Sequence, residues 1–204
     1  MELMAAHDDA RARSSRVAAS SAPARPRRAA RSVALLVSVA ASVLAALVPV
    51  GAASASEREA RRALVGREAP DFTQRVLGGG NFRLSERRGE VVLLGFWTSW
   101  CGGCREHLER LARLDATYGS AGLVVVGVSL DDDPQRAAEL REAVAASFRN
   151  VLDSDKRLGR EYRVNDLPMI VLIDRAGTVR HVHGEVSRRG EGALLEEIRR
   201  LLDE

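Results

Sequence analysis

The sequence contains only two cysteines, Cys101 and Cys104, and they lie three positions apart. Small secreted domains that depend on a disulfide framework carry several cysteines, because every bridge joins two separate parts of the chain. No third thiol is present to pair with either cysteine. A disulfide-stapled scaffold is therefore excluded, and the chemistry of this pair must be local to the Cys-X-X-Cys motif.

An excess of positive charge is missing from most of the chain. Residues 1–55 hold seven of the 31 basic residues and three of the 28 acidic ones, which leaves 24 basic and 25 acidic residues in the remainder. A nucleic-acid-binding domain shows a basic patch or stripe. The remainder has no such charge excess, so we expect no nucleic-acid partner.

The basic N-terminal segment has the three parts of a secretory signal. Arginines precede an uncharged run over residues 32–50, and Ala53-Ser54-Ala55 supplies the small residues of a cleavage site. The run is also close to the roughly 20 residues that span a bilayer. No cysteine lies near it, so a lipoprotein anchor is excluded. We predict that residues 1–55 are a cleaved signal peptide or a retained membrane anchor, that 56–65 are a linker, and that 66–204 form the folded domain.

Hydrophobic patterning in the remainder predicts alternating strands and helices. Continuous apolar runs over residues 91–97 and 123–130 are typical of buried strands. Glycine-rich turns between short apolar pieces predict a hairpin within 66–84. The other expected elements are helices over 102–118, 134–147, 155–162 and 192–202 and strands over 151–152, 169–174 and 178–183. This order predicts an α/β domain with a central mixed sheet and helices on both faces.

The two cysteines stand where the first buried strand gives way to a helix. The N-terminus of a helix has unpaired N–H groups and the positive end of the dipole. A thiolate at Cys101 is stabilised there, so we expect a lowered pKa for this thiol. Cys101 would attack a substrate disulfide, and Cys104, expected one turn into the helix, would resolve the mixed disulfide.

Metal binding and a purely structural role are the alternatives for the cysteine pair. A structural zinc site needs two further ligands at similar spacing. The four histidines, His7, His107, His181 and His183, form no such pair, so we expect no metal there. An inert disulfide closing so short a loop adds little stability. His181 and His183 fall on one face of a predicted strand, where they could bind a metal or simply face solvent.

Several ordered motifs resemble one family. Phe96-Trp97-Thr98-Ser99-Trp100-Cys101-Gly102-Gly103-Cys104-Arg105 resembles the active-site signature of the thioredoxin superfamily, in its TlpA/ResA/CcmG-type extracytoplasmic branch. Gly66-Arg67-Glu68-Ala69-Pro70-Asp71-Phe72 resembles the G-x-x-A-P-D-F opening of that branch, and Leu167-Pro168 resembles the superfamily's proline loop. The resemblance spans residues 66–202. It implies a thioredoxin-like three-layer sandwich with an N-terminal hairpin.

The resemblance also implies a site and an activity. Pro168 is expected to be cis and to pack beside the cysteines, leaving the Leu167 backbone free to pair with an extended peptide. Trp100 would offer an apolar platform beside Cys101. The implied activity is thiol–disulfide exchange on exported proteins in the periplasm or at the outer face of the membrane, for example in cytochrome c maturation. A membrane thiol carrier would supply electrons to a monomer that needs no cofactor.

The sequence departs from the family pattern at three positions. Gly95 stands where thioredoxin has a buried acid, His107 where the branch often has glutamate, and Glu109 where a helix-kinking proline is usual. A histidine titrates near neutral pH when its environment is ordinary. His107 would then tune the thiols; the alternative is a partly exposed helix histidine without a role.

Two other functions remain as alternatives. Thr98 lies three residues before Cys101, as thiol peroxidases of the peroxiredoxin type require, but Leu94 occupies the place of their proline. Copper chaperones with a thioredoxin-like fold use C-x-x-x-C and a distal histidine, and the spacing here is one residue short. The direction of exchange, reductive or oxidative, depends on the relative stability of the two redox states.

Overall fold

The computed structural model describes residues 59–187 and 189–204. The predicted signal peptide or anchor, residues 1–55, lies outside the described residues. Within the described part, no helix has the length and apolar character needed to cross a membrane.

Five strands form the central sheet, in the spatial order β5-β4-β3-β6-β7. These strands are β3 (Val91–Trp97), β4 (Leu123–Ser129), β5 (Arg149–Leu152), β6 (Met169–Ile173) and β7 (Val179–His183). The neighbours β3, β4 and β5 are parallel, whereas β6 runs antiparallel to β3 and β7 antiparallel to β6. The predicted mixed sheet is confirmed.

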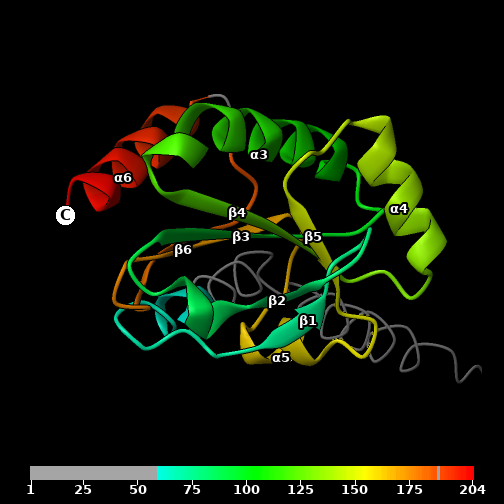
Figure 1. Ribbon diagram of the computed structural model, residues 1–204, viewed down its shortest axis with the longest axis horizontal. Helices are drawn as coiled ribbons and strands as arrows, with labels where there is room; N and C mark the ends of the chain where they lie inside the picture. Colours follow the sequence, from blue (N-terminus) through cyan, green and yellow to red (C-terminus); the bar gives the residue numbers. More distant parts are fainter. Residues whose placement is uncertain (1–58, 188) are drawn as a thin grey trace, which may run out of the picture. The chain divides into compact units, whose positions relative to one another are not determined.

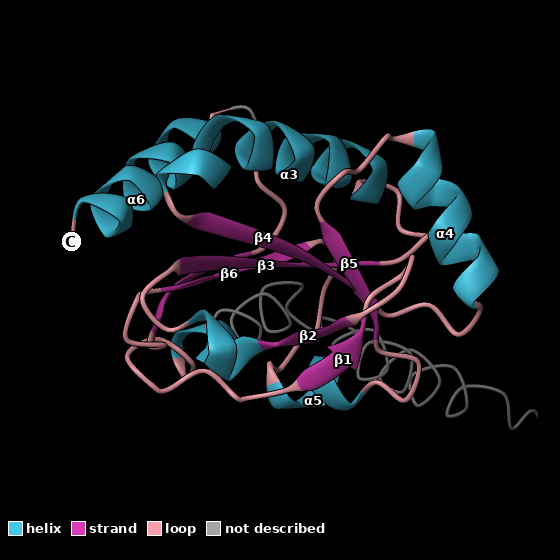
Figure 2. Cartoon of the chain, in the orientation of Figure 1, coloured by secondary structure: helices cyan, strands magenta, loops and turns pink. Residues whose placement is uncertain are grey.

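Helices cover both faces of this sheet (Figure 1). On one side lie α3 (Cys104–Tyr118), α4 (Pro134–Ala143) and α6 (Glu191–Asp203). On the other side lie α5 (Arg157–Glu161) and the hairpin of β1 (Thr73–Arg75) and β2 (Asn81–Arg83). Figure 2 shows the three layers by secondary structure. The predicted α/β sandwich with an N-terminal hairpin is thus confirmed.

The residues of β3 divide between two cores because successive side chains of a strand point to opposite faces. Val92, Leu94 and Phe96 pack under the hairpin and α5. Leu93 and Trp97 pack on the other face with α3 and α6. Every residue of β3 is buried, which accounts for its unbroken apolar sequence and places the residues that follow it at a fixed edge of the sheet.

The four helices begin and end within two residues of their predicted bounds, except at the end of α4. Helix α3 begins at Cys104 rather than at residue 102. Helix α4 ends at Ala143, short of the predicted 147, because Ala145 adopts a positive φ of 49°. Asp133 caps the N-terminus of α4, since its carboxylate accepts a hydrogen bond from the Gln135 N–H at 2.9 Å. Two short 3₁₀ helices, η1 (Leu84–Arg87) and η2 (Gly119–Ala121), connect strands to their neighbours.

Candidate active site

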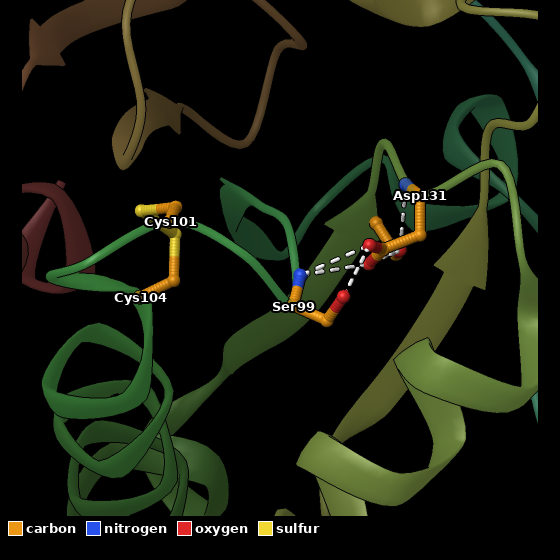
Figure 3. Close-up of a disulfide and its surroundings, with 5 residues drawn as sticks. Ser99, Cys101, Cys104 and Asp131 are labelled. Carbon is orange, nitrogen blue, oxygen red and sulfur yellow. Dashed lines mark hydrogen bonds between the residues drawn. A yellow bond between two sulfur atoms is a disulfide. The ribbon is translucent and has the colours of Figure 1, made fainter.

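The two cysteines lie at the carboxyl end of β3, where the chain turns into α3, and they form a disulfide (Figure 3). Their Cα atoms are 5.3 Å apart. Cys104 is the first residue of α3 and is completely buried, whereas Cys101 lies in the preceding turn and is partly exposed. Cys104 therefore lies at the helix start rather than one turn inside it. The geometry presents one sulfur to solvent and keeps the other behind it.

A buried aspartate holds the loop that leads to Cys101. The Asp131 carboxylate accepts hydrogen bonds from the Ser99 N–H at 3.0 Å and from the Ser99 hydroxyl at 2.6 Å (Figure 3). It also accepts one from the Ser129 hydroxyl at 2.8 Å. Charge-assisted hydrogen bonds of this kind are the stronger ones. The position of the active-site turn is thus fixed to the neighbouring strand.

Asp131 was not among the predicted site residues, although the register between β3 and β4 would have indicated it. The parallel pairing places Trp97 opposite Ser129. Two residues further along each chain, Ser99 comes opposite Asp131. A parallel pairing of the two buried runs, read from the sequence, would have brought these polar residues together at the carboxyl edge of the sheet.

The predicted proline loop lies beside the cysteines. The Leu167–Pro168 bond is cis, as the resemblance implied. A Cβ atom placed on Gly103 would lie 3.7 Å from Pro168 Cδ, so the proline ring packs against the turn between the cysteines. Among the described residues, no backbone hydrogen bond uses the N–H or C=O of Leu167. Both groups can therefore pair with an incoming chain.

An open groove runs from Cys101 along the proline loop. Trp100 is 72% exposed and forms one side of this groove, which encloses about 430 Å³. The lining residues are Trp100, Cys101, Gly102, Leu130, Val164, Asn165, Asp166 and Leu167. A second depression of about 540 Å³ adjoins it, sharing Trp100 and Leu167 and extending to basic side chains of Lys156, Arg160 and Arg163. The surface beside Cys101 is therefore long, largely apolar near the sulfur, and basic at its far end.

A carboxylate that sequence reasoning missed lies near the same turn. Glu185 follows β7, and a Cβ atom placed on Gly103 would lie 3.1 Å from its Oε1 atom. This places a negative charge close to the N-terminal end of α3. The contact joins two loops distant in the sequence, so no local pattern indicates it.

His107 lies buried, with 1% of its surface exposed, and is not the partly exposed histidine of the alternative interpretation. Burial, assisted by the charge of Arg110, lowers the pKa of His107 to about 3. The imidazole is therefore neutral at pH 7, contrary to the expectation that it titrates near neutral pH. Its Nε2 atom has no hydrogen-bond partner among the described residues.

Gly95 explains why a histidine fits at this position. A Cβ atom on Gly95 would lie 2.9 Å from His107 Nε2 and would overlap Leu111 Cδ1. The glycine in β3 thus leaves the space that His107 fills from α3. The two departures from the family pattern, at positions 95 and 107, are therefore linked. The space that a side chain at 95 would need is occupied by His107.

The remaining described histidines do not join the cysteines. His181 and His183 lie on β7 and face Glu197 of α6. In the described part of the chain, these three residues form the only group with metal-binding geometry, and it contains no cysteine. The described residues therefore offer no ligand set that would turn the Cys101–Cys104 pair into a metal centre.

Comparisons with known proteins agree with this geometry. Residues 65–182 match the AhpC/TSA family. The thiol-disulfide oxidoreductase ResA of Geobacillus kaustophilus is 31% identical over 118 residues, which cover 58% of this chain and 68% of ResA. The thioredoxin-like protein YneN of Bacillus subtilis is 28% identical over 121 residues, covering 58% of this chain and 70% of YneN.

A solved structure is also similar to this chain in sequence and fold. The crystal structure of a protein assigned as the thiol:disulfide interchange protein DsbE of Chlorobium tepidum is 35% identical in sequence. It aligns with a TM-score of 0.65 over 68% of this chain and 97% of the other.

Proposed function

Because the chain belongs to the AhpC/TSA family of thioredoxin-like proteins and is a thiol–disulfide oxidoreductase, we propose that it reduces disulfides of exported proteins outside the cytoplasm. The observation that carries this proposal is the arrangement of the cysteines. A partly exposed Cys101 opens onto a groove, and a buried Cys104 lies within bonding distance behind it.

The exchange begins with the reduced protein. The Cys101 thiolate attacks one sulfur of the substrate disulfide, and the other substrate sulfur leaves as a thiolate that takes up a proton. Cys104 then loses its proton and attacks Cys101, releasing the second substrate thiol. The substrate gains two electrons and two protons, and the protein is left with the Cys101–Cys104 disulfide. An external dithiol of the membrane returns the two electrons and two protons.

The surroundings of Cys101 favour this order of attack. The sulfur lies before the first turn of α3, where free N–H groups and the helix dipole stabilise negative charge. Cys104 is completely buried and cannot meet a folded substrate first. Exposure and electrostatics thus select the same cysteine as the nucleophile.

An extended peptide fits the groove better than a compact ligand. The N–H and C=O of Leu167 pair with no backbone group of residues 59–187 and 189–204, so they can add the peptide to the protein as a short strand. Trp100 supplies apolar contact next to the sulfur. These groups bind the peptide backbone and apolar side chains rather than one particular sequence. We therefore expect the substrates to be unfolded or partly folded proteins, apocytochrome c among them.

The proposed location rests on residues 1–55. Their arginine cluster, uncharged run and small-residue exit are typical of export. Arginines before the run favour a cytoplasmic N-terminus, whether the segment is cleaved or retained, and this places the domain on the opposite side of the membrane. We expect the domain to act as a monomer in the periplasm or at the outer face of the membrane.

Trapping tests the proposal. A Cys104→Ser variant, expressed with its N-terminal segment, should accumulate mixed disulfides through Cys101 with exported proteins, visible on non-reducing gels and identifiable by mass spectrometry. The matched control is the Cys101→Ser, Cys104→Ser double variant, which should trap nothing. If the adducts are equally abundant in the control, or consist of cytoplasmic proteins alone, the proposal is wrong.

The resting redox state in the cell decides the direction. Alkylation of the free thiols in acid-quenched cells should show mostly reduced cysteines for a reductase. A mostly oxidised pair would mean that the protein forms disulfides instead. Hydrogen peroxide consumption by the reduced protein, abolished in Cys101→Ser but retained in Cys104→Ser, would support the thiol peroxidase alternative. Copper binding that is lost in the double variant would support the chaperone alternative.

A further inference from the structure

Two histidines and a glutamate converge at the edge of the sheet, apart from the cysteines. His181 and His183 lie two residues apart on β7, so their side chains point to the same face. They pair in register with Leu172 and Ile170 of β6, which belong to the core on the α6 side. Glu197 projects from α6 onto the same face. The convergence therefore follows from the packing of α6 on the edge strand.

The distances among these groups suit a single ion. His181 Nδ1 lies 3.3 Å from Glu197 Oε1, and His183 Nε2 lies 2.6 Å from Glu197 Oε2. One ligand atom from each residue lies within 4.8 Å of the others. Around a tetrahedral Zn²⁺ with bonds of about 2.0–2.1 Å, ligand atoms lie about 3.4 Å apart. The three side chains are thus close enough to surround one ion after small shifts.

From this geometry we propose that His181, His183 and Glu197 bind one divalent transition-metal ion of the Zn²⁺ class. Two imidazole nitrogens and one carboxylate oxygen form a donor set suited to Zn²⁺, Co²⁺ or Ni²⁺. The three side chains are 30%, 28% and 20% exposed, so an ion can enter from solvent and keep a fourth position for water or a partner group. The ion replaces the hydrogen bond between His183 and Glu197, and the neutral His183 imidazole then carries its one proton on Nδ1.

The surrounding charges permit a cation. Arg180 adjoins His181 on β7, but its guanidinium pairs with Asp174 at 3.3 Å and with Glu204 at 2.7 Å. Arg200 of α6 is exposed. The guanidinium of Arg180 is thus largely neutralised, and Glu197 supplies the negative charge at the centre of the group. The ion would tie the edge strand to the last helix.

Zinc titration of the oxidised full chain tests this site. The Cys101–Cys104 disulfide removes both thiols as ligands, and a His7→Gln background removes the one histidine outside the described residues. Calorimetry with Zn²⁺ should show one saturable site. His183→Gln and Glu197→Gln should each weaken Zn²⁺ binding at least tenfold. Glu196→Gln, the same change at the exposed residue just before Glu197, should leave Zn²⁺ binding unchanged.

A spectroscopic readout separates a true site from loss of folding. Co²⁺ should give visible absorption bands of a low-coordinate histidine–carboxylate complex, and Zn²⁺ should abolish them competitively. Circular dichroism without metal should match the parent for every variant. The proposal is overturned if the parent shows no saturable binding, if Glu196→Gln weakens binding as much as Glu197→Gln, or if the cobalt bands persist in His183→Gln. Each result would leave the cluster as a hydrogen bond between β7 and α6.

Discussion

The buried histidine His107 makes a quantitative prediction about stability and pH. Folding lowers its pKa from 6.5 to about 3, chiefly through burial. Between these two pH values, the unfolded chain binds a proton that the folded chain does not. The free energy of unfolding therefore falls as the pH falls below 6.5, by up to about 1.4 kcal/mol per pH unit. Below about pH 3 both states are protonated and this contribution no longer changes.

The size of the effect follows from the same two pKa values. Moving from about pH 7 to about pH 4.5 should remove about 2.5 kcal/mol of stability through His107 alone. Urea unfolding of the oxidised chain, followed by tryptophan fluorescence, measures this at both pH values. The variants His107→Leu and His107→Gln cannot titrate, so each should lose about 2.5 kcal/mol less than the parent over this interval.

Comparison between parent and variant isolates the histidine. Carboxylates with shifted pKa values, such as Asp71, Asp115 and Asp153, are present in all three proteins and cancel in the difference. The stability of a variant at pH 7 does not enter, since only the change with pH is compared. If parent and both variants lost equal stability, His107 would not be buried in its neutral form and the reasoning would be refuted.

Three further predictions concern the sheet and the active-site turn. A Cβ atom on Gly127 would overlap the buried Asn150 Oδ1, so Gly127→Ala should lower the free energy of unfolding by about 1–3 kcal/mol in urea titrations. Asp131→Asn weakens the bonds that fix the loop before Cys101 and should cost about 1–3 kcal/mol by the same measurement. Glu185→Gln removes a negative charge beside the N-terminus of α3, and in a Cys104→Ser background it should lower the pKa of Cys101, as read from thiolate absorbance against pH.

Each of these changes has a matched control on the same chain. Gly119→Ala introduces a Cβ with no heavy atom nearer than 3.8 Å and should be close to neutral. Asp132→Asn alters an exposed neighbour of Asp131. Glu196→Gln removes an exposed charge from α6. If a control moved its readout as far as its partner variant, the assigned contact would not be the cause.

Strands were predictable where burial alone decides the residue type. The run over 91–97 is apolar throughout because β3 is covered on both faces, and its predicted bounds are those observed. Strand β4 ends one residue earlier than predicted, at Ser129. Helix α4 was overestimated because its end depends on Ala145 in a left-handed conformation, and alanine gives no signal for that.

The parts of the site that escaped prediction are contacts across the fold. His107 is buried because Gly95, on a different element, leaves room for it. Glu185 approaches Gly103 because β7 ends near the start of α3. A motif reports what is adjacent along the chain, so it identified the cysteines and the proline loop but not the side chains packed around them. Asp131 belongs to no motif, but the parallel register of β3 and β4 would have placed it opposite Ser99.

The distinct roles of the two sulfurs can be measured directly. Reduced single-cysteine variants should differ sharply in their reaction with a small aromatic disulfide near neutral pH. Cys104→Ser, which retains Cys101, should form a mixed disulfide rapidly and stoichiometrically, and Cys101→Ser should react far more slowly. Equal rates, or faster reaction at Cys104, would contradict the assignment of an exposed nucleophile and a buried resolving thiol.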